Sequence, residues 1–330
     1  TYTAVLLEQV LPEDAAGCRA VVLETLETGG QTERWVALVA VPKAGPVDDA
    51  LLRAILKQTG SGSEPMDTAV HEALKNAEGV EDAAARRMWR VAANAAPPLR
   101  AALYYALGIH RSQDLRKDVL RVALQDEDAG VRRAAAFGLL RALPLEGDLP
   151  SEDHALLAAF SAAAQDDEDE AVRAYAVFAL GRFDARAAPA APVLVARLSD
   201  TSARVRSGAT TALVAIGDPA LPVLATALDG GDRALTEAAA YILRRIGTPA
   251  AVDALRAGLA SEDDYVRGRV AMALRAAQAP DVDALGIFRE LLGSEDADVA
   301  LLGLEGIGQM GADAAPAIDG VRPLVRHADP

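Results

Sequence analysis

Hydrophobic and polar positions from residue 97 onward follow a helical period that restarts at regular intervals. When an apolar anchor is numbered position 0, apolar or small residues recur at positions 4, 7, 8 and 11, which share one face of an α-helix. Position 8 is leucine or isoleucine in every copy, and positions 4 and 7 are mostly alanine or glycine. The anchors are Leu99, Val131, Val172, Val205, Leu235, Val266 and Val299.

The anchors lie 30 to 33 residues apart, except for one interval of 41 that residues 144–150 lengthen. A period of this size is typical of stacked helical repeats. Ahead of most anchors lies a shorter apolar segment, and prolines at 189, 219 and 249 suit the first turn of a helix there. Each repeat is therefore predicted to hold a short first helix, an acidic turn and a longer second helix.

The acidic turns place a capping residue three positions before the anchor. A short polar side chain at this place accepts a hydrogen bond from the first backbone N–H groups of the helix. The turns lack the ligand spacing and the glycine of a calcium loop, so we interpret them as caps and predict no metal site. The residues are Asp128, Asp169, Asp232, Asp263 and Asp296, with Ser202 in the remaining copy.

Residues 1–45 follow a different pattern, which we interpret as an N-terminal cap or a small docking module. Segments rich in Val and Thr flank the turn at 28–32, and this arrangement predicts a short antiparallel β-meander. The alternative is a set of short helices, because Cys18, Val22 and Leu26 also fit a helical stripe. A terminal repeat needs its apolar face covered, which favours the cap over the docking module.

Residues 46–96 predict an irregular helical segment that leads into the regular array at 97–330. Asp48 to Gln58 forms a clear helix behind an aspartate cap, and Gly60 to Ser63 is a flexible break. Two more helices are expected at 65–77 and 80–94. At the other end, residues 316–330 resemble a first helix without its second, so we expect the chain to continue with another repeat.

The motif Val-Arg-x-x-Ala-x-x-Ala-Leu-Gly, clearest at 172–181, resembles the short HEAT-like repeats of bacterial scaffold proteins and phycobilin lyases. The resemblance covers residues 97–330 and departs at Thr236 and Ala300, where the arginine is missing. It implies an all-α, right-handed solenoid of about seven helix pairs, with second helices lining a concave face. It also implies a ladder of charged residues between repeats: Asp128, Arg132, Asp169, Arg173, Arg206, Asp263 and Arg267.

Position 6 of each repeat lies away from the core stripe, yet several copies carry a large apolar residue there. Such residues either pack between neighbouring repeats or form an exposed stripe, and exposed apolar stripes mark interaction sites. The second interpretation predicts a partner-binding groove. Its residues are Tyr105, Phe137, Phe178, Tyr241 and Met272, widened by Tyr104 and Val177 at position 5.

Composition narrows the classes of partner. A net charge of -15 and a pI near 4.7 argue against nucleic acids and anionic membranes, and favour a basic or amphipathic protein or peptide. Apolar runs are too short to span a bilayer, so we expect no membrane insertion. A single cysteine, Cys18, excludes a disulfide within the chain. A cytoplasmic location is expected, with a mature secreted or periplasmic form left open.

Motifs for catalysis are lacking. The sequence has neither a phosphate-binding glycine loop with Lys-Ser/Thr nor a Gly-x-Ser-x-Gly motif, and its four histidines are far apart. We therefore expect no catalytic residues and no cofactor. The predicted function is a non-catalytic scaffold or adaptor that binds a protein or peptide in the concave groove. Two alternatives are a tetrapyrrole-handling protein similar to chromophore lyases and a structural assembly component.

Overall fold

All regular elements that the structure describes are helices, and they follow one another in pairs as a solenoid, which confirms the predicted fold class. One isolated bridge between Val47 and Val80 joins two connecting segments. The chain forms two compact units, 1–176 and 177–330, and the boundary falls inside α11 (Glu170–Gly181). The computed structural model describes residues 14–59, 64–75, 80–110, 119, 122–143, 154–279 and 282–317.

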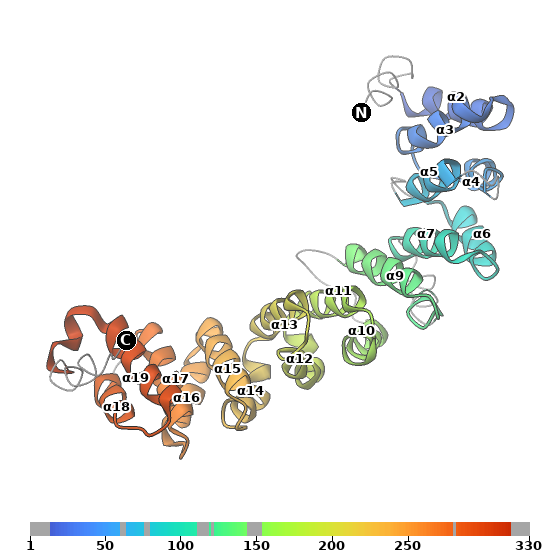
Figure 1. Cartoon of the computed structure of the whole chain (residues 1–330). Coiled ribbons are helices and arrows are strands. Elements are labelled where there is room, and N and C mark those ends of the chain that lie inside the picture. Colours follow the sequence, from blue (N-terminus) through green and yellow to red (C-terminus); the bar gives the residue numbers. More distant parts are fainter. Residues whose placement is uncertain are drawn as a thin grey trace. The chain divides into compact units, whose positions relative to one another are not determined.

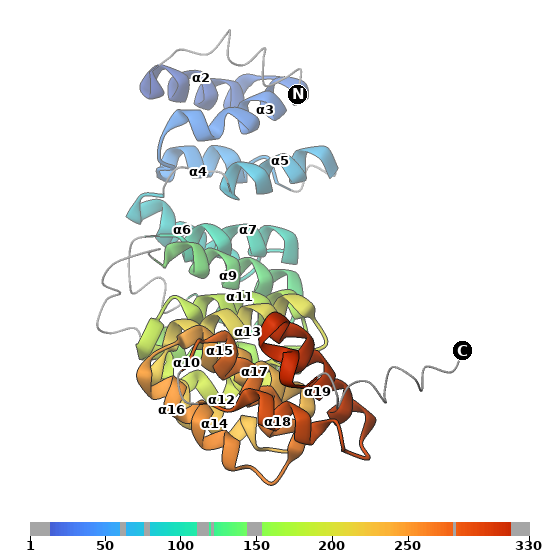
Figure 2. The same ribbon diagram turned by 90° about the vertical axis from the view of Figure 1, so that its left-hand side faces the viewer.

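Unit 1 stacks helix pairs as successive layers (Figures 1 and 2). The second helices before α11 contact one another in sequence, and the first helices of the first three pairs form a row of their own. The first helices are α2 (Ala15–Thr28), α4 (Asp49–Leu56), α6 (Asp82–Ala92) and α10 (His154–Asp166). The second helices are α3 (Gln31–Ala40), α5 (Glu64–Lys75), α7 (Pro97–Gly108), α9 (Ala129–Ala142) and α11.

The β-meander predicted near the N-terminus is wrong over its described part, which consists of α2, α3 and the 3-10 turn η1 (Val41–Ala44). Cys18, Val22 and Leu26 are each only 1% exposed, so the helical stripe, not the weak alternation, decides the local structure. The glycine turn expected between strands joins two helices instead. Glu33 accepts a hydrogen bond from the Gly30 N–H at 2.6 Å and starts α3. Residues 1–13 lie outside the described part of the chain.

Residues 46–96 continue the same rows of helices. The predicted helix at 48–58 is confirmed as α4, and Asp48 caps it by accepting a hydrogen bond from the Leu51 N–H at 2.8 Å. The buried amide of Gln58 donates to the carbonyls of Leu26 and Ala54, both at 3.0 Å, and so ties α4 to α2. The predicted flexible break at 60–63 lies outside the described residues, and the predicted domain boundaries stay predictions.

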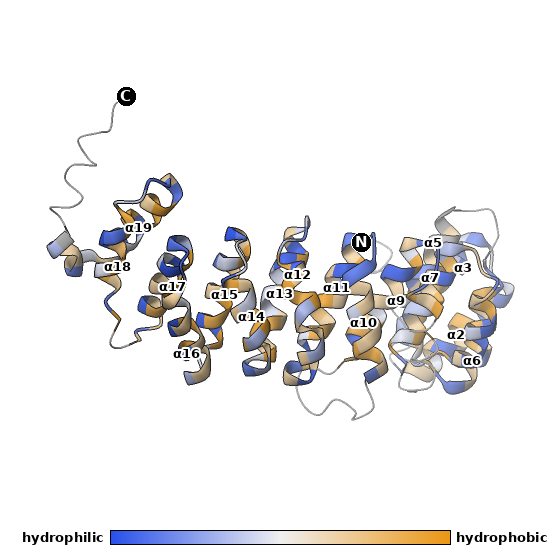
Figure 3. Cartoon of the chain, turned by 90° about the horizontal axis from the view of Figure 1, so that it is seen from below, coloured by the Kyte–Doolittle hydropathy of each residue, from blue (hydrophilic) through white to orange (hydrophobic). Residues whose placement is uncertain are grey.

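Unit 2 repeats the arrangement, with hydrophobic and hydrophilic residues alternating along its helices (Figure 3). Short 3-10 turns at η2 (Asp184–Ala190), η3 (Asp218–Ala220), η4 (Gly258–Ala260) and η5 (Gly311–Ala317) enter or extend the helices. The first helices are α12 (Ala191–Arg197), α14 (Leu221–Leu228), α16 (Pro249–Ala257) and α18 (Ala284–Leu291). The second helices are α13 (Ala203–Ile216), α15 (Arg233–Ile246), α17 (Asp264–Ala276) and α19 (Ala297–Met310).

Hydropathy and length rule out a membrane span for any single helix that the structure describes. One combination does pass that test, α13 taken together with the segment Asp218–Leu228, but the two parts meet at an angle of 114°. Both parts carry the buried leucines of the repeat pattern, including Leu213 and Leu224 at 0% exposure. Their apolar character is therefore explained by the core of unit 2.

The core of each unit lies between its two rows of helices, as the repeat pattern predicts. The leucines at position 8 are at most 1% exposed, and Ile307 is 7% exposed. Small residues at position 7 allow close contact between second helices. A Cβ atom added to Gly138 of α9 would lie only 2.7 Å from the Tyr105 carbonyl oxygen of α7. The six leucines at position 8 are Leu107, Leu139, Leu180, Leu213, Leu243 and Leu274.

The predicted aspartate caps are confirmed. Asp128 accepts a hydrogen bond from the Val131 N–H at 3.1 Å, Asp263 from the Tyr265 N–H at 2.7 Å, and Asp169, Asp232 and Asp296 make equivalent bonds. Ser202 occupies the same place before α13, but its hydroxyl makes no capping bond. Each aspartate satisfies a backbone donor that the helix cannot satisfy itself.

We predict that Asp232→Ala lowers the free energy of unfolding by about 1 kcal/mol, because two N–H groups at the start of α15 lose their acceptor. Ser202→Ala is the matched control and should change the stability much less, since its hydroxyl caps nothing. Urea unfolding followed by circular dichroism measures both. Equal losses for the two variants would contradict the capping role of Asp232.

A second prediction concerns Asp49, whose carboxylate links α4 to α6 by accepting hydrogen bonds from Arg87 and pairs with Arg53. The hydrogen bond from Arg87 holds the pKa of Asp49 at about 2, below its ordinary value of 3.8. Because the pKa is lower in the folded chain, this link stabilises the fold above about pH 4 and is lost as the pH falls toward 2. Between about pH 4 and pH 2, the free energy of unfolding of Asp49→Asn should therefore fall less than that of the wild type. An NMR titration that places the Asp49 carboxyl near 3.8 would refute the prediction.

Candidate functional site

The arginine that follows the anchor binds its own acidic turn. The Nη1 group of Arg132 donates to the carbonyl oxygens of Asp126 and Glu127, at 2.9 and 3.2 Å. Arg173, Arg206 and Arg267 each make the same two bonds to the carbonyls five and six residues earlier. The arginine column thus closes the turn between the first and second helix of a repeat.

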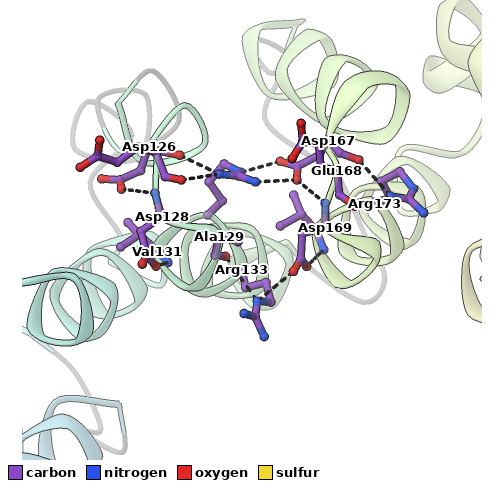
Figure 4. A network of polar contacts seen from close by, with 12 residues as sticks. Asp126, Asp128, Ala129, Val131, Arg133, Asp167, Glu168, Asp169 and Arg173 are labelled. Carbon is purple, nitrogen blue, oxygen red and sulfur yellow. Dashed lines mark hydrogen bonds and ion pairs between the residues drawn. The ribbon is translucent and has the colours of Figure 1, made fainter.

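In unit 1, Arg100 and Arg132 of this column also reach the next repeat, and Figure 4 shows the polar contacts around Asp126 and Asp167. Arg132 donates through Nε and Nη2 to the two carboxylate oxygens of Asp167, at 2.8 and 3.0 Å. Arg100 donates from Nη2 to Oδ1 of Asp126 at 2.8 Å, and its Nε lies 2.7 Å from Oδ2 of the same carboxylate. The hydrogen bond to Asp167 raises the pKa of Arg132 further, and both side chains are mostly buried. These contacts form a ladder of bidentate ion pairs between neighbouring repeats.

The carboxylates of this ladder lie two residues before the capping residues that the sequence pointed to. Asp126 and Asp167 each also accept a hydrogen bond from the N–H of the following cap, Asp128 or Asp169, at 2.9 Å. Asp128 and Asp263 act as caps, whereas Asp169 is both a cap and a partner of Arg133 at 3.3 Å. The available signal was an aspartate at this place in three successive turns, at 126, 167 and 200.

Two turns of unit 2 carry a serine in place of the ladder aspartate. Ser261 and Ser294 stand at the place of the ladder aspartate and accept from the following cap. Among the residues that the structure describes, Arg206 contacts no carboxylate, and Arg267 pairs with Asp264 of its own turn. Thr236, which stands where the arginine is missing, donates from its buried hydroxyl to the Leu228 carbonyl at 2.9 Å. The turn is still closed, but without an inter-repeat charge pair there.

The face of the second helices opposite the core forms a groove in unit 1, with a volume of about 610 Å³. Tyr105, Phe137 and Tyr175 lie in a row across α7, α9 and α11, with ring centroids 5.8 and 5.0 Å apart. Phe137 remains 38% exposed. We call this surface the aromatic groove, and it is also lined by His71, Glu72, Pro98, Ala101, Gly130, Arg133, Ala134 and Arg141.

Two arginines of the aromatic groove differ in their partners. Arg133 is 3.3 Å from the Asp169 carboxylate and donates to the Ala129 carbonyl, so its charge is compensated. Arg141 donates to the neutral hydroxyl of Tyr105 at 3.0 Å, and no carboxylate among the described residues contacts it. The groove therefore combines exposed aromatic carbon with an uncompensated positive charge.

The structure separates the residues predicted for the groove. Tyr105 and Phe137 line it, whereas Tyr104 and Val177 are 2% and 0% exposed and belong to the core. The side chain at position 5 points toward the adjacent repeat. Within unit 2, a Cβ atom added to Gly208 would lie only 2.6 Å from the Cγ2 atom of Val177. Tyr175, Arg133 and Arg141 were missed, although positions 2, 3 and 10 share the helical face of position 6.

The other predicted groove residues lie in unit 2. Phe178 is half-buried, with the Arg204 guanidinium 5.7 Å from its ring centroid. Tyr241 is 41% exposed and accepts a hydrogen bond from Arg245 at 2.9 Å. Met272 packs against the hydrophobic cluster around Phe288. Each of these side chains has local contacts of its own.

Groups suited to covalent or metal chemistry are not gathered anywhere in the described ranges. No cluster of three or more His, Cys, Asp or Glu side chains there could hold a metal ion. Burial raises the pKa of the Cys18 thiol, which keeps it protonated and unreactive. The aromatic groove offers ring faces and a guanidinium, which are groups for non-covalent binding.

The repeats of this chain match a known family of helical repeats. Residues 157–243 and 220–275 match the family of HEAT repeats. This part of the chain, 157–275, therefore consists of HEAT repeats. Comparison with curated protein sequences gives no match.

Solved structures of the importin type share the fold of this HEAT-like chain. A mutant form of Kap121p is 13% identical, with a TM-score of 0.58, and the match covers 93% of this chain and 39% of that one. Kap121p bound to Nup53p is 16% identical with a TM-score of 0.50, covering 87% of this chain and 37% of that one. This chain thus spans about two fifths of Kap121p. Human deoxyhypusine hydroxylase also matches, at 20% identity over 80% of this chain and 97% of that one, but its TM-score of 0.34 is too low to support an argument.

We predict that Arg132→Gln lowers the free energy of unfolding by about 2–3 kcal/mol, because it strands the mostly buried Asp167 carboxylate and opens the turn. Arg206→Gln should cost about 1 kcal/mol, since Arg206 binds only the carbonyls of its own turn. Urea unfolding followed by circular dichroism compares the two. Equal costs would show that the bond to the next repeat adds no stability.

Proposed function

We propose that this HEAT-like protein is a non-catalytic scaffold or adaptor that binds a segment of a partner protein in the aromatic groove. The supporting observation is the row of three rings, Tyr105, Phe137 and Tyr175, which lines a groove of about 610 Å³ and leaves Phe137 38% exposed. Exposed aromatic clusters of this kind are typical of binding surfaces, where a few aromatic and arginine residues carry most of the affinity.

The fold supports the proposal at a general level. HEAT-repeat solenoids, the importins among them, serve as protein-binding scaffolds, and Kap121p has been solved bound to Nup53p. Extended rows of parallel second helices present a long surface on which successive repeats contribute one side chain each. The same geometry places residues from α7, α9 and α11 side by side in unit 1.

The lining of the aromatic groove favours an amphipathic segment. An apolar side of the segment would cover the exposed ring of Phe137, and polar groups would meet Glu72, Arg133 and Arg141 at its margins. The net charge of -15 attracts basic flanking sequence to the surface outside the groove. The partner we propose is therefore a protein or peptide with an amphipathic segment.

The test is photo-crosslinking from the groove in native lysate. With p-benzoylphenylalanine at position 137, we expect a protein adduct of discrete mass, and Tyr175→Ala in the same chain should reduce it by removing the neighbouring ring. The matched control carries the photo-reactive residue at Val21, which is 40% exposed on α2 in the row of first helices. Equal adducts at both positions, or adducts from position 21 alone, would refute the groove as the binding site.

A further inference from the structure

The same pair of side chains recurs on the second helices of both units. A tyrosine at position 6 accepts a hydrogen bond from an arginine at position 10, in Tyr105–Arg141 at 3.0 Å and in Tyr241–Arg245 at 2.9 Å. In the first pair the arginine comes from the next repeat, whereas in the second both residues belong to one helix. In each case an exposed aromatic ring lies beside the arginine, Phe137 at 38% exposure or Tyr241 itself at 41%.

Neither arginine is compensated by a carboxylate from the described part of the chain. Other arginines on this face are compensated: Arg133 by Asp169, Arg269 by Glu237, and Arg233 by Asp296. The chain has 48 acidic and 33 basic residues, so an internal acidic partner would be the ordinary outcome. Instead a neutral phenol holds the guanidinium in place and leaves its charge for an external anion.

We propose, resting on the function proposed above, that the aromatic groove selects a linear peptide in which an Asp or Glu residue neighbours a large apolar residue. The peptide carboxylate binds Arg141, and the apolar side chain covers Phe137 and Tyr175. A guanidinium has five donors, and the Tyr105 hydroxyl engages only one of its nitrogens, which leaves donors for a carboxylate. Tyr241 and Arg245 present the same pair of groups in unit 2.

A carboxylate fits the groove better than a phosphate. Arg141 brings one uncompensated charge, which a single carboxylate neutralises, while a phosphate group at pH 7 carries nearly two negative charges. Arg133, the other arginine of the groove, is already paired with Asp169. The net charge of -15 adds long-range repulsion that grows with the charge of the ligand.

The experiment selects peptides from a random 12-residue phage library on the full-length chain. We expect the selected peptides to be enriched in Asp or Glu next to Phe, Leu or Trp. For a synthetic peptide from this set, Arg141→Gln should raise the Kd about tenfold or more, because a charge-assisted bond is lost. The matched control Arg90→Gln removes an exposed arginine of α6 in the first-helix row and should leave the Kd unchanged.

A double-mutant cycle assigns the contact. Replacing the acidic residue of the peptide by Gln or Asn should weaken binding to the wild-type chain and have little effect on Arg141→Gln, since the two changes remove one interaction. Circular dichroism confirms that each variant is folded. A phosphoserine version of the peptide that binds more tightly than the Glu version would overturn the carboxylate assignment.

The outcomes separate this inference from the function on which it rests. Selected peptides that need Phe137 but are neutral or rich in Lys and Arg, with Arg141→Gln binding as the wild type does, would refute the inference and leave the groove as a binding site. Selected peptides whose binding is unchanged by Phe137→Ala would refute both.

Discussion

The close approach of neighbouring second helices is the constraint on which the rest of the structure depends. Gly138 of α9 lies so near the Tyr105 carbonyl of α7 that no side chain fits between them. This spacing has two consequences at once. On the inner side it lets leucines at position 8 fill the space between the rows of helices. On the outer side it brings the rings of Tyr105 and Phe137 to a centroid distance of 5.8 Å, so the aromatic groove is a product of core packing.

Two aspartates in each acidic turn of the ladder stabilise this spacing, and each has a different role. The capping aspartate, such as Asp128, satisfies the start of its own helix, while the aspartate two residues earlier accepts from the arginine of the preceding repeat. Arg132 donates to a backbone carbonyl of the same turn and also to the carboxylate of Asp167 in the next turn. Continuous polar contacts therefore run from α7 to α11. In unit 2 Arg206 and Arg267 bind the carbonyls of their own turns, and Thr236 closes its turn through a hydroxyl.

Charged side chains at the acidic turns and in the aromatic groove have different roles. Carboxylates at the turns serve helix starts and the ladder, as Asp128 and Asp126 do. The aromatic groove lies on a different face and carries an arginine held by a neutral phenol. An acidic chain thus carries a local positive charge that no described carboxylate contacts, which the net charge of -15 by itself would not predict.

The sequence by itself determined the repeat, the second helices, the aspartate caps and the buried leucines, because helical periodicity and capping are local and recur in every copy. It did not determine the partner of each arginine: Asp126 and Asp167 become partners of Arg100 and Arg132 only when one repeat stacks on the next. The same holds for Tyr104 and Val177, which periodicity placed on the surface and which the neighbouring repeat covers. Near the N-terminus, Cys18, Val22 and Leu26 fitted two local structures, and packing against α3 and α4 selected the helix. Contacts within one repeat are encoded in its own residues, whereas contacts between repeats depend on the stacking distance and rotation, which only the tertiary structure decides.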